Sequence, residues 1–202
     1  MKPTTSHYGL SLTKRLFDVS IGSLVLLIVI AISPFIFVAI KCSSRGPIFF
    51  QQPRIGLNGR LFSMIKFRTL KTISHSHHES GLCPPHSSRN TLVGTLMRKL
   101  HLDEFPQCIN VIKGDMSVVG PRPYIEEECV TLNKTYPEFA YRHNVKPGIT
   151  GLAQLAYDHE NDESSTLEKL RHDLEYIQTC SFKKDVVIVV KTLYESIRLR
   201  GI

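Results

Sequence analysis

The sequence predicts a mainly α-helical protein with one small β-hairpin, in which an N-terminal membrane helix joins a compact cytosolic domain. Three observations support this fold class: an apolar run at 19–40, a turn signal at 58–59 between two short strand-like stretches, and amphipathic helical patterns in most of the remainder. A chain of 202 residues holds one moderate domain with its own core. We therefore divide it into a polar leader at 1–13, a membrane helix at 14–41 and a cytosolic domain at 42–202.

The net charge and the cysteines limit the possible classes of protein. The formal net charge of +7 indicates an anionic partner, which leaves nucleic acid, anionic lipid and a phosphorylated substrate open. The five cysteines are scattered, odd in number and without a CxxC pair. They are Cys42, Cys83, Cys108, Cys129 and Cys180. This pattern predicts reduced thiols in a cytosol-facing protein and argues against a disulfide framework or a zinc site.

The apolar run at 19–40 is the predicted membrane element. It is longer than the apolar part of a usual signal peptide and has no clear small-residue cleavage site, so we interpret it as a retained anchor. At about 1.5 Å per residue it is long enough to cross a bilayer once. A plain transmembrane helix is therefore one interpretation.

Two features favour a re-entrant helix, which enters and leaves the membrane by the same face. Pro34 removes a backbone N–H and displaces the carbonyl of Ile30, and the Ser33 hydroxyl can bond a carbonyl freed in this way. Basic residues also flank the run at both ends, whereas a single span normally has its basic excess at the cytoplasmic end. These flanking residues are Lys14, Arg15, Lys41 and Arg45.

A β-hairpin is predicted after the membrane helix. A Gly/Pro-punctuated stretch at 45–56, the Asn-Gly turn signal and an apolar strand at 61–69 follow one another. Lys66 and Arg68 lie two residues apart, so they share one face of the strand. A solvated strand edge is the plain interpretation of such a pair, and a phosphate contact is the functional one.

The stretch 98–123 contains the densest grouping of chemically active side chains. Asp103 and Glu104 open a short apolar-periodic run that predicts a helix with its acids at the N-terminus. Ordinary helices use such acids to satisfy their free N–H groups, which is the structural interpretation. Arg98 lies about one turn upstream of the pair, and Arg122 lies between two prolines of fixed φ, where its guanidinium suits a phosphate.

Amphipathic helices are predicted around this stretch. They cover 91–100, 124–132, 166–177 and 182–199, and the first and last are apolar enough to lie at a membrane interface. A basic loop at 135–151 contains Arg142. The Ser/His-rich stretch at 71–90 predicts a surface loop rather than a metal-binding tract, because its histidine spacing is unlike that of zinc sites.

The ordered motifs resemble the small monotopic bacterial phosphoglycosyl transferases, which are polyprenyl-phosphate sugar-phosphate transferases of the bacterial sugar transferase family. The matching motifs are KRLFD at 14–18, SP at 33–34, KFRT at 66–69, LDE at 102–104, KGDMS at 113–117, GPRP at 120–123 and VKPGITG at 145–151. They occur in the family's order over roughly residues 12–195. No single motif is decisive, but the ordered set is highly specific.

The resemblance implies a function and a set of roles. Asp103 would attack the β-phosphate of a UDP-sugar, release UMP and hold the phosphosugar until polyprenyl phosphate accepts it, and Glu104 would be a metal ligand or an acid/base partner. Mg²⁺ is the implied cation, bound by the two acids. The implied phosphate- or nucleotide-binding residues are Lys66, Arg68, Arg98, Arg122 and Arg142, and the implied membrane hinge is Ser33 and Pro34.

The resemblance also implies the location and the partners. It predicts a monotopic protein on the cytoplasmic face of a bacterial inner membrane, with a UDP-sugar donor, a polyprenyl phosphate acceptor and no nucleic acid. Two residues depart from the family pattern: Leu152 replaces a usual tryptophan, and His101 replaces a usual small hydroxyl residue. A membrane-tethered nucleotide-sugar hydrolase and a basic protein that binds membranes or nucleic acid are the alternatives.

Overall fold

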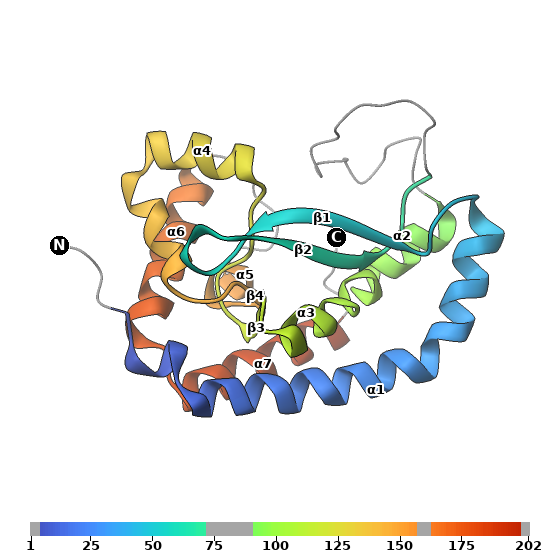
Figure 1. Ribbon diagram of the computed structural model, residues 1–202, viewed down its shortest axis with the longest axis horizontal. Helices are drawn as coiled ribbons and strands as arrows, with labels where there is room; N and C mark the ends of the chain where they lie inside the picture. Colours follow the sequence, from blue (N-terminus) through green and yellow to red (C-terminus); the bar gives the residue numbers. More distant parts are fainter. Residues whose placement is uncertain (1–4, 72–90, 157–162, 199–202) are drawn as a thin grey trace.

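A long helix, α1 (Leu12–Ser43), forms one side of the molecule, and the other elements lie along it (Figure 1). The computed structural model describes residues 5–71, 91–156 and 163–198. The most apolar window of α1 has a mean hydropathy of 2.9, and 11% of that window is buried inside the protein. α1 is therefore long and apolar enough to cross a membrane, as the sequence predicts, and it extends slightly beyond the predicted range of 14–41 at both ends.

Pro34 lies in the second half of α1. The helix continues through Pro34, and the hydroxyl of Ser33 donates a hydrogen bond to the carbonyl of Ile30 at 3.0 Å. Proline has no N–H to bond that carbonyl, so the serine replaces the missing donor. Figure 1 shows that the C-terminal part of α1 turns away from the direction of its first part.

Both ends of α1 are bonded to the same body of the protein. Near the first end, Arg15 donates to two carbonyls of α3 (Gln107–Lys113) at 2.6 Å each, and Lys14 is buried. Beyond the last turn, Arg68 donates to the carbonyl of Ser44 at 2.7 Å. The two basic residues before the apolar run, which the sequence analysis treated as a membrane flank, are therefore committed to contacts inside the protein.

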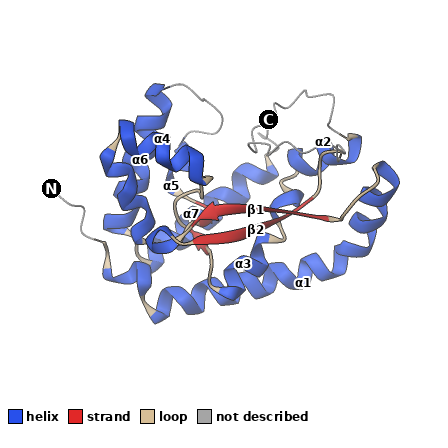
Figure 2. Cartoon of the chain, turned by 45° about the horizontal axis from the view of Figure 1, so that its top comes forward, coloured by secondary structure: helices blue, strands red, loops and turns tan. Residues whose placement is uncertain are grey.

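The predicted hairpin is confirmed. β1 (Phe49–Ile55) pairs antiparallel with β2 (Leu61–Phe67), which ends before the predicted boundary at 69. Asn58 and Gly59 both have positive φ, 53° and 74°, as a tight Asn-Gly turn requires. Figure 2 shows the hairpin above α3, between α2 at one end and α4 and α6 at the other.

A second, two-stranded sheet is a feature that the sequence analysis did not predict. β3 (Ser117–Val119) and β4 (Gly148–Thr150) pair in parallel. The chain passes so close to itself here that a Cβ on Gly148 would lie 2.1 Å from the backbone nitrogen of Gly120. Glycine is therefore required where the GPRP and VKPGITG motifs meet.

Helices make up most of the remaining described structure, and the predicted helical segments are confirmed with shifted ends. They are η1 (His7–Leu10), α2 (Leu92–Lys99), α4 (Glu126–Thr135), η4 (Pro137–Asn144), α5 (Leu152–Ala156), α6 (Glu163–Thr179) and α7 (Phe182–Ile197), where η denotes a 3-10 helix. The predicted basic loop at 135–151 is occupied by η4 and β4. Almost all of the predicted Ser/His-rich loop at 71–90 lies outside the described residues.

The core joins α1 to the hairpin and to the helices beside it. One cluster brings Val29 and Ile40 of α1 together with Phe67, Met97 and Cys108. Other apolar side chains face outward on α2 and α7, as an interfacial position requires. The exposed residues include Leu92, Leu96, Val186, Val187, Val190 and Leu193.

Candidate active site

The two predicted acids lie on a short turn between two helices. Asp103 and Glu104 belong to η3 (Leu102–Glu104), and His101 before them has a left-handed φ of 53°. The sequence predicts these acids at the start of the following helix, but α3 begins later, at Gln107. The acids therefore occupy a turn of their own, ahead of α3.

Glu104 is held by two cations. Its Oε1 accepts a hydrogen bond from Lys66 Nζ at 2.6 Å and another from Arg122 Nη2 at 3.4 Å. Burial by itself would raise the pKa of Glu104, but the charges of Lys66 and Arg122 outweigh burial and lower the pKa far below its usual range. Glu104 is therefore an ionised carboxylate with a fixed position.

Asp103 has the opposite properties. Burial and the charge of Glu104 raise the pKa of Asp103 from 3.8 to about 6, although Lys66 and Arg98 oppose the shift. No side chain among the described residues donates a hydrogen bond to its carboxylate. Two adjacent carboxyl groups with widely separated pKa values indicate different roles in chemistry. Within the described residues, Asp103 is therefore the acid that no other side chain holds by a hydrogen bond, although its own backbone N–H bonds to it.

Arg98 and Arg122 complete the charged surroundings of the acids. Arg98 Nε donates to the hydroxyl of Thr69 at 3.1 Å, which holds the arginine near Asp103. The side chain of Arg122 is 52% exposed, so it contacts Glu104 and also faces solvent. Together with Lys66, these residues are the predicted cations that the structure brings to the acidic pair.

A buried asparagine that sequence reasoning missed fixes the strand that carries Lys66. Asn110 in α3 accepts from the backbone N–H of Ile65 at 3.1 Å and donates to the carbonyl of Ser63 at 2.8 Å. An amide inside a buried helix face is stable only when it is bonded in this way. The signal in the sequence was a polar residue within the apolar pattern of 107–113.

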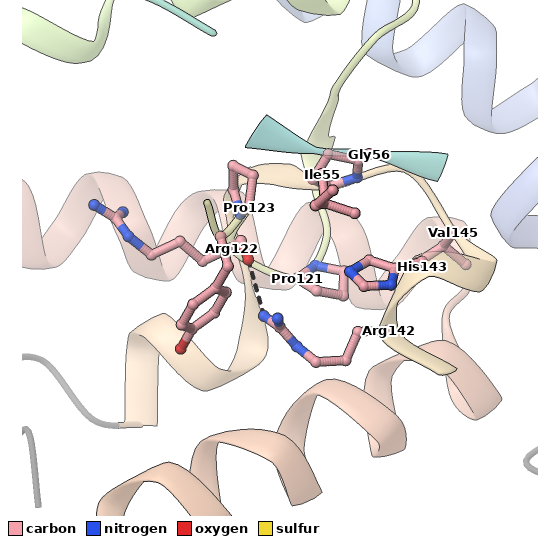
Figure 3. A pocket seen from close by; sticks show the side chains of 10 residues that line it. Ile55, Gly56, Pro121, Arg122, Pro123, Arg142, His143 and Val145 are labelled. Carbon is pink, nitrogen blue, oxygen red and sulfur yellow. Dashed lines mark hydrogen bonds between the residues drawn. The ribbon is translucent and has the colours of Figure 1, made fainter. Parts of the chain in front are cut away.

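Arg142 does not reach the acidic pair. Its Nε donates to Asp173 at 2.7 Å. Its Nη2 donates to the carbonyl of Arg122 at 2.9 Å, the bond marked in Figure 3. The guanidinium also lies 4.6 Å from the ring centroids of both Tyr124 and Phe139. The pocket drawn in Figure 3 has a volume of about 10 Å³, which is about enough for one water molecule. Arg142 therefore supports the loop that presents Arg122.

Arg68 also does not bond to either acid in the described structure. Its Nη2 bonds to Ser44, just beyond the end of α1. Lys66 lies in β2 and Arg68 comes directly after this strand, but Lys66 bonds to Glu104 and Arg68 bonds to Ser44 at the end of α1. Lys66 and Arg68, which the sequence predicts on one face, therefore bond to two different parts of the protein.

The acidic pair provides oxygen ligands but does not form a closed metal site. Within the described ranges, no group of three or more His, Cys, Asp or Glu side chains gathers in a way that would hold a metal ion. The carboxylate oxygens of Asp103 and Glu104 suit a hard cation that takes most of its ligands from water and substrate phosphate. This donor set fits Mg²⁺ and does not fit a zinc site.

The described structure thus combines an acidic pair, three nearby cations and a helix that is long and apolar enough to cross a membrane. A family model described as "Bacterial sugar transferase" matches residues 10–198. Since this match covers nearly the whole chain, the protein belongs to the bacterial sugar transferase family.

Several curated proteins are similar to this chain. A UDP-N-acetylgalactosamine-undecaprenyl-phosphate N-acetylgalactosaminephosphotransferase of Aeromonas hydrophila is 41% identical over 77% of this chain and 37% of its own length. A UDP-glucose:undecaprenyl-phosphate glucose-1-phosphate transferase of Escherichia coli (strain K12) is 37% identical over 91% of this chain and 40% of its own length. The exopolysaccharide production protein ExoY of Sinorhizobium fredii is 36% identical over 90% of this chain and 84% of its own length. The chain thus spans less than half of the first two proteins.

Proposed function

We propose that the protein transfers a sugar 1-phosphate from a UDP-sugar to membrane polyprenyl phosphate, giving polyprenyl-diphosphate-sugar and UMP. The reaction is the first membrane step of surface glycan assembly. The observation that carries this proposal is the free carboxylate of Asp103, beside an ionised Glu104 that Lys66 and Arg122 hold. The names of the Aeromonas and Escherichia relatives describe the same class of transfer.

The reaction proceeds in two displacements at one phosphorus atom. A carboxylate oxygen of Asp103 attacks the β-phosphorus of the donor, the bond to the bridging oxygen breaks, and UMP leaves with both electrons of that bond. A phosphate oxygen of the lipid acceptor then attacks the same phosphorus, and the bond to Asp103 breaks to restore the carboxylate. Splitting the transfer in this way replaces one difficult step by two easier ones.

The neighbouring charges supply the stabilisation that phosphoryl transfer needs. Phosphoryl transfer depends on positioning and on neutralising negative charge at the phosphate oxygens. Arg122 is exposed and set between two prolines, so it is placed to bind the donor diphosphate. Lys66 and Arg98 keep positive charge close to the acids. Asp103 and Glu104 would hold Mg²⁺, which would add to the neutralisation of the diphosphate.

The protein sits on the cytoplasmic face of the bacterial inner membrane, with α1 as a re-entrant helix hinged at Ser33 and Pro34. The support is that both ends of α1 are bonded to one domain, Arg15 to α3 at one end and Ser44 to Arg68 at the other. A helix that spanned the bilayer would separate its ends by the thickness of the membrane.

Labelling of single cysteines tests this topology. Cys42 lies exposed near the end of α1, so a variant that keeps it and has serine at the other four cysteines reports one end, and Leu12→Cys in that background without Cys42 reports the other. We expect a membrane-impermeant maleimide to label both positions in inverted vesicles and neither in intact cells. Labelling of one end from outside the cell would show a spanning helix instead.

Release of UMP tests the function. The full chain in detergent with Mg²⁺ is given a panel of UDP-sugars with and without polyprenyl phosphate. We expect one burst of UMP per protein molecule without the lipid and continuous release with it, for at least one sugar. Continuous release without lipid would identify a nucleotide-sugar hydrolase. No release from any sugar would contradict the enzyme reading.

A further inference from the structure

Arg68 lies at the junction between the hairpin and the end of the membrane helix. It is 7% exposed, and its backbone N–H bonds to the carbonyl of Ile48 at 2.8 Å. Its Nη2 donates to the carbonyl and the hydroxyl of Ser44 at 2.7 and 3.1 Å and approaches the carbonyl of Ile40 at 3.5 Å. The guanidinium is thus held at the C-terminal end of α1.

The other two nitrogens of this guanidinium are unused. Nε and Nη1 of Arg68 are buried, and neither has a hydrogen-bond partner in the part of the chain that the structure describes. No carboxylate among the described residues forms an ion pair with Arg68, whereas the buried Arg142 is paired with Asp173. Burial lowers the pKa of Arg68, and no acidic group opposes that effect. A buried cation with unbonded donors is unfavourable unless an anion completes it.

The position of Arg68 connects the membrane helix to the acidic pair. Two residues before it, Lys66 bonds to Glu104, and one residue after it, Thr69 bonds to Arg98, whose charge acts on Asp103. A phosphate at Arg68 would therefore lie on the side of the acids that faces the end of α1. A lipid headgroup is confined to the membrane in which α1 is proposed to lie, so it would approach the acids from that side. A soluble nucleotide is not confined in this way.

The surface beside this junction is apolar. Phe49 and Phe50 at the start of β1 are partly exposed, and so are Phe35 and Val38 in the last turns of α1. Phe37, Phe49 and Phe67 pack ring against ring under this surface, with ring centroids 5.4–6.2 Å apart. Apolar side chains around one unpaired guanidinium match a ligand with a phosphate head and a hydrocarbon tail.

We infer that Arg68 binds the phosphate of the polyprenyl phosphate acceptor and is separate from the residues that bind the UDP-sugar. This inference rests on the proposed function. It divides the predicted cations into two groups: Arg122, Lys66 and Arg98 serve the donor and the acids, and Arg68 serves the lipid. Arg68 then acts only in the second displacement, when the acceptor attacks the phosphosugar on Asp103.

Measuring the two displacements separately distinguishes binding of the lipid phosphate by Arg68 from a purely structural role of Arg68 at the end of α1. The test compares the full chain, Arg68→Gln and the control Arg60→Gln, which removes an exposed arginine beyond the other end of the same strand. Acceptor-free UMP bursts report the first displacement, and steady-state rates at varied polyprenyl phosphate report the second. We expect Arg68→Gln to keep the burst amplitude and the donor KM within about twofold and to raise the acceptor KM by at least about tenfold. Arg60→Gln should change neither.

Three results would overturn the inference. An unchanged acceptor KM would show that Arg68 does not bind the lipid phosphate, and an equal loss of both half-reactions would show a purely structural role at the end of α1. A changed dependence on added phosphatidylglycerol, with the acceptor KM unaltered, would assign Arg68 to a phospholipid headgroup. If Arg68→Gln does not fold, the same split is expected for Arg68→Lys, which keeps the charge but not the planar guanidinium. Failure of the wild-type chain to give any burst would instead contradict the proposed function itself.

Discussion

Two groups of charged side chains in this protein are both largely withdrawn from water, yet they differ in how completely their charges are paired. The first, which we call the α1 cluster, consists of Lys14, Asp18 and Asp185 with Tyr8 and Tyr176. Lys14 Nζ lies 2.6 Å from Asp185 and 3.4 Å from Asp18, and the hydroxyls of Tyr176 and Tyr8 donate to Asp185 at 2.7 and 3.1 Å. Burial and Asp185 raise the pKa of both tyrosines, which stay protonated as donors.

The second group is the acidic pair with its cations. Glu104 is bonded to Lys66, but Asp103 has no side-chain donor among the described residues, and Arg122 is half exposed. The α1 cluster therefore uses its charges to fix the first turns of α1 on β3 and α7, whereas the acidic pair keeps charge available for a ligand. The same residue types give stability in one place and reactivity in the other, depending on whether every donor and acceptor is used internally.

The largest expected effect is a loss of transfer activity when the acidic pair loses the carboxylate of Asp103. Asp103→Asn keeps the shape of the side chain but removes the nucleophilic oxygen, so we expect sugar-phosphate transfer and the acceptor-free UMP burst to fall by at least about 10³-fold. Membrane association should be unchanged, which the fraction of protein recovered with membranes measures. Substantial turnover in this variant would exclude Asp103 as the nucleophile.

The next largest expected effect is a loss of stability when the α1 cluster loses its lysine. Lys14→Met leaves Asp18 and Asp185 buried without their cation, and breaking a buried pair in this way costs about 3–5 kcal/mol. Thermal unfolding in detergent should show a large fall in Tm. The control is Lys184→Met, since Lys184 lies 2.9 Å from Glu175, whose side chain is 53% exposed. An exposed pair contributes about 0–1 kcal/mol, so comparable losses in the two variants would refute the contrast.

The comparison also shows what the sequence could predict. The long apolar helix, the Asn-Gly hairpin and the helical segments follow from local periodicity and turn chemistry, and all are confirmed. The grouping of Lys66, Arg98 and Arg122 at the acidic pair was available from the resemblance of the motifs to the family. Local patterns therefore predicted the elements. The resemblance implied five cations at the site, and the structure brings three of them to the acidic pair but not Arg68 or Arg142.

The partners of the buried charges were not predictable in this way. Lys14 and Asp185 are 171 residues apart in the chain, and Arg142 bonds to Asp173 on α6. Lys14 was assigned to the flank of the membrane helix and Arg142 to phosphate binding, because a single sequence does not reveal which distant acid will neutralise a lysine or arginine. The short strands β3 and β4 were missed for a related reason, since three residues are too few to show an alternating pattern.

A smaller effect concerns pH, and it links reactivity to stability at Asp103. Its pKa is raised from 3.8 to about 6, so transfer should fall about tenfold per pH unit below pH 6 as the carboxylate is protonated. For an acid, a raised pKa in the folded state means that the folded protein binds the proton more tightly. Ionised Asp103 therefore destabilises the fold above pH 6, and that penalty disappears as the pH falls towards 4.

Asp103→Asn tests this linkage without activity. The variant should be more stable than the wild type at pH 8 by roughly 1–3 kcal/mol, and the difference should shrink between pH 6 and pH 4. Unfolding is measured with a chelator present, since a bound cation would also stabilise the carboxylate. A stability difference that does not vary with pH would show that the environment of Asp103 does not raise its pKa.

The smallest effect concerns the backbone that presents the acidic pair. His101 has a φ of 53°, a left-handed conformation that asparagine tolerates and that β-branched residues adopt only with strain. His101→Val should therefore lower stability by about 1–2 kcal/mol and slow transfer, because the turn that carries Asp103 and Glu104 must shift. His101→Asn should be close to wild type in both Tm and transfer rate. If Asn impairs transfer as much as Val does while Tm is unchanged, the imidazole itself contributes to the reaction, and the departure of His101 from the usual hydroxyl residue concerns chemistry rather than backbone geometry.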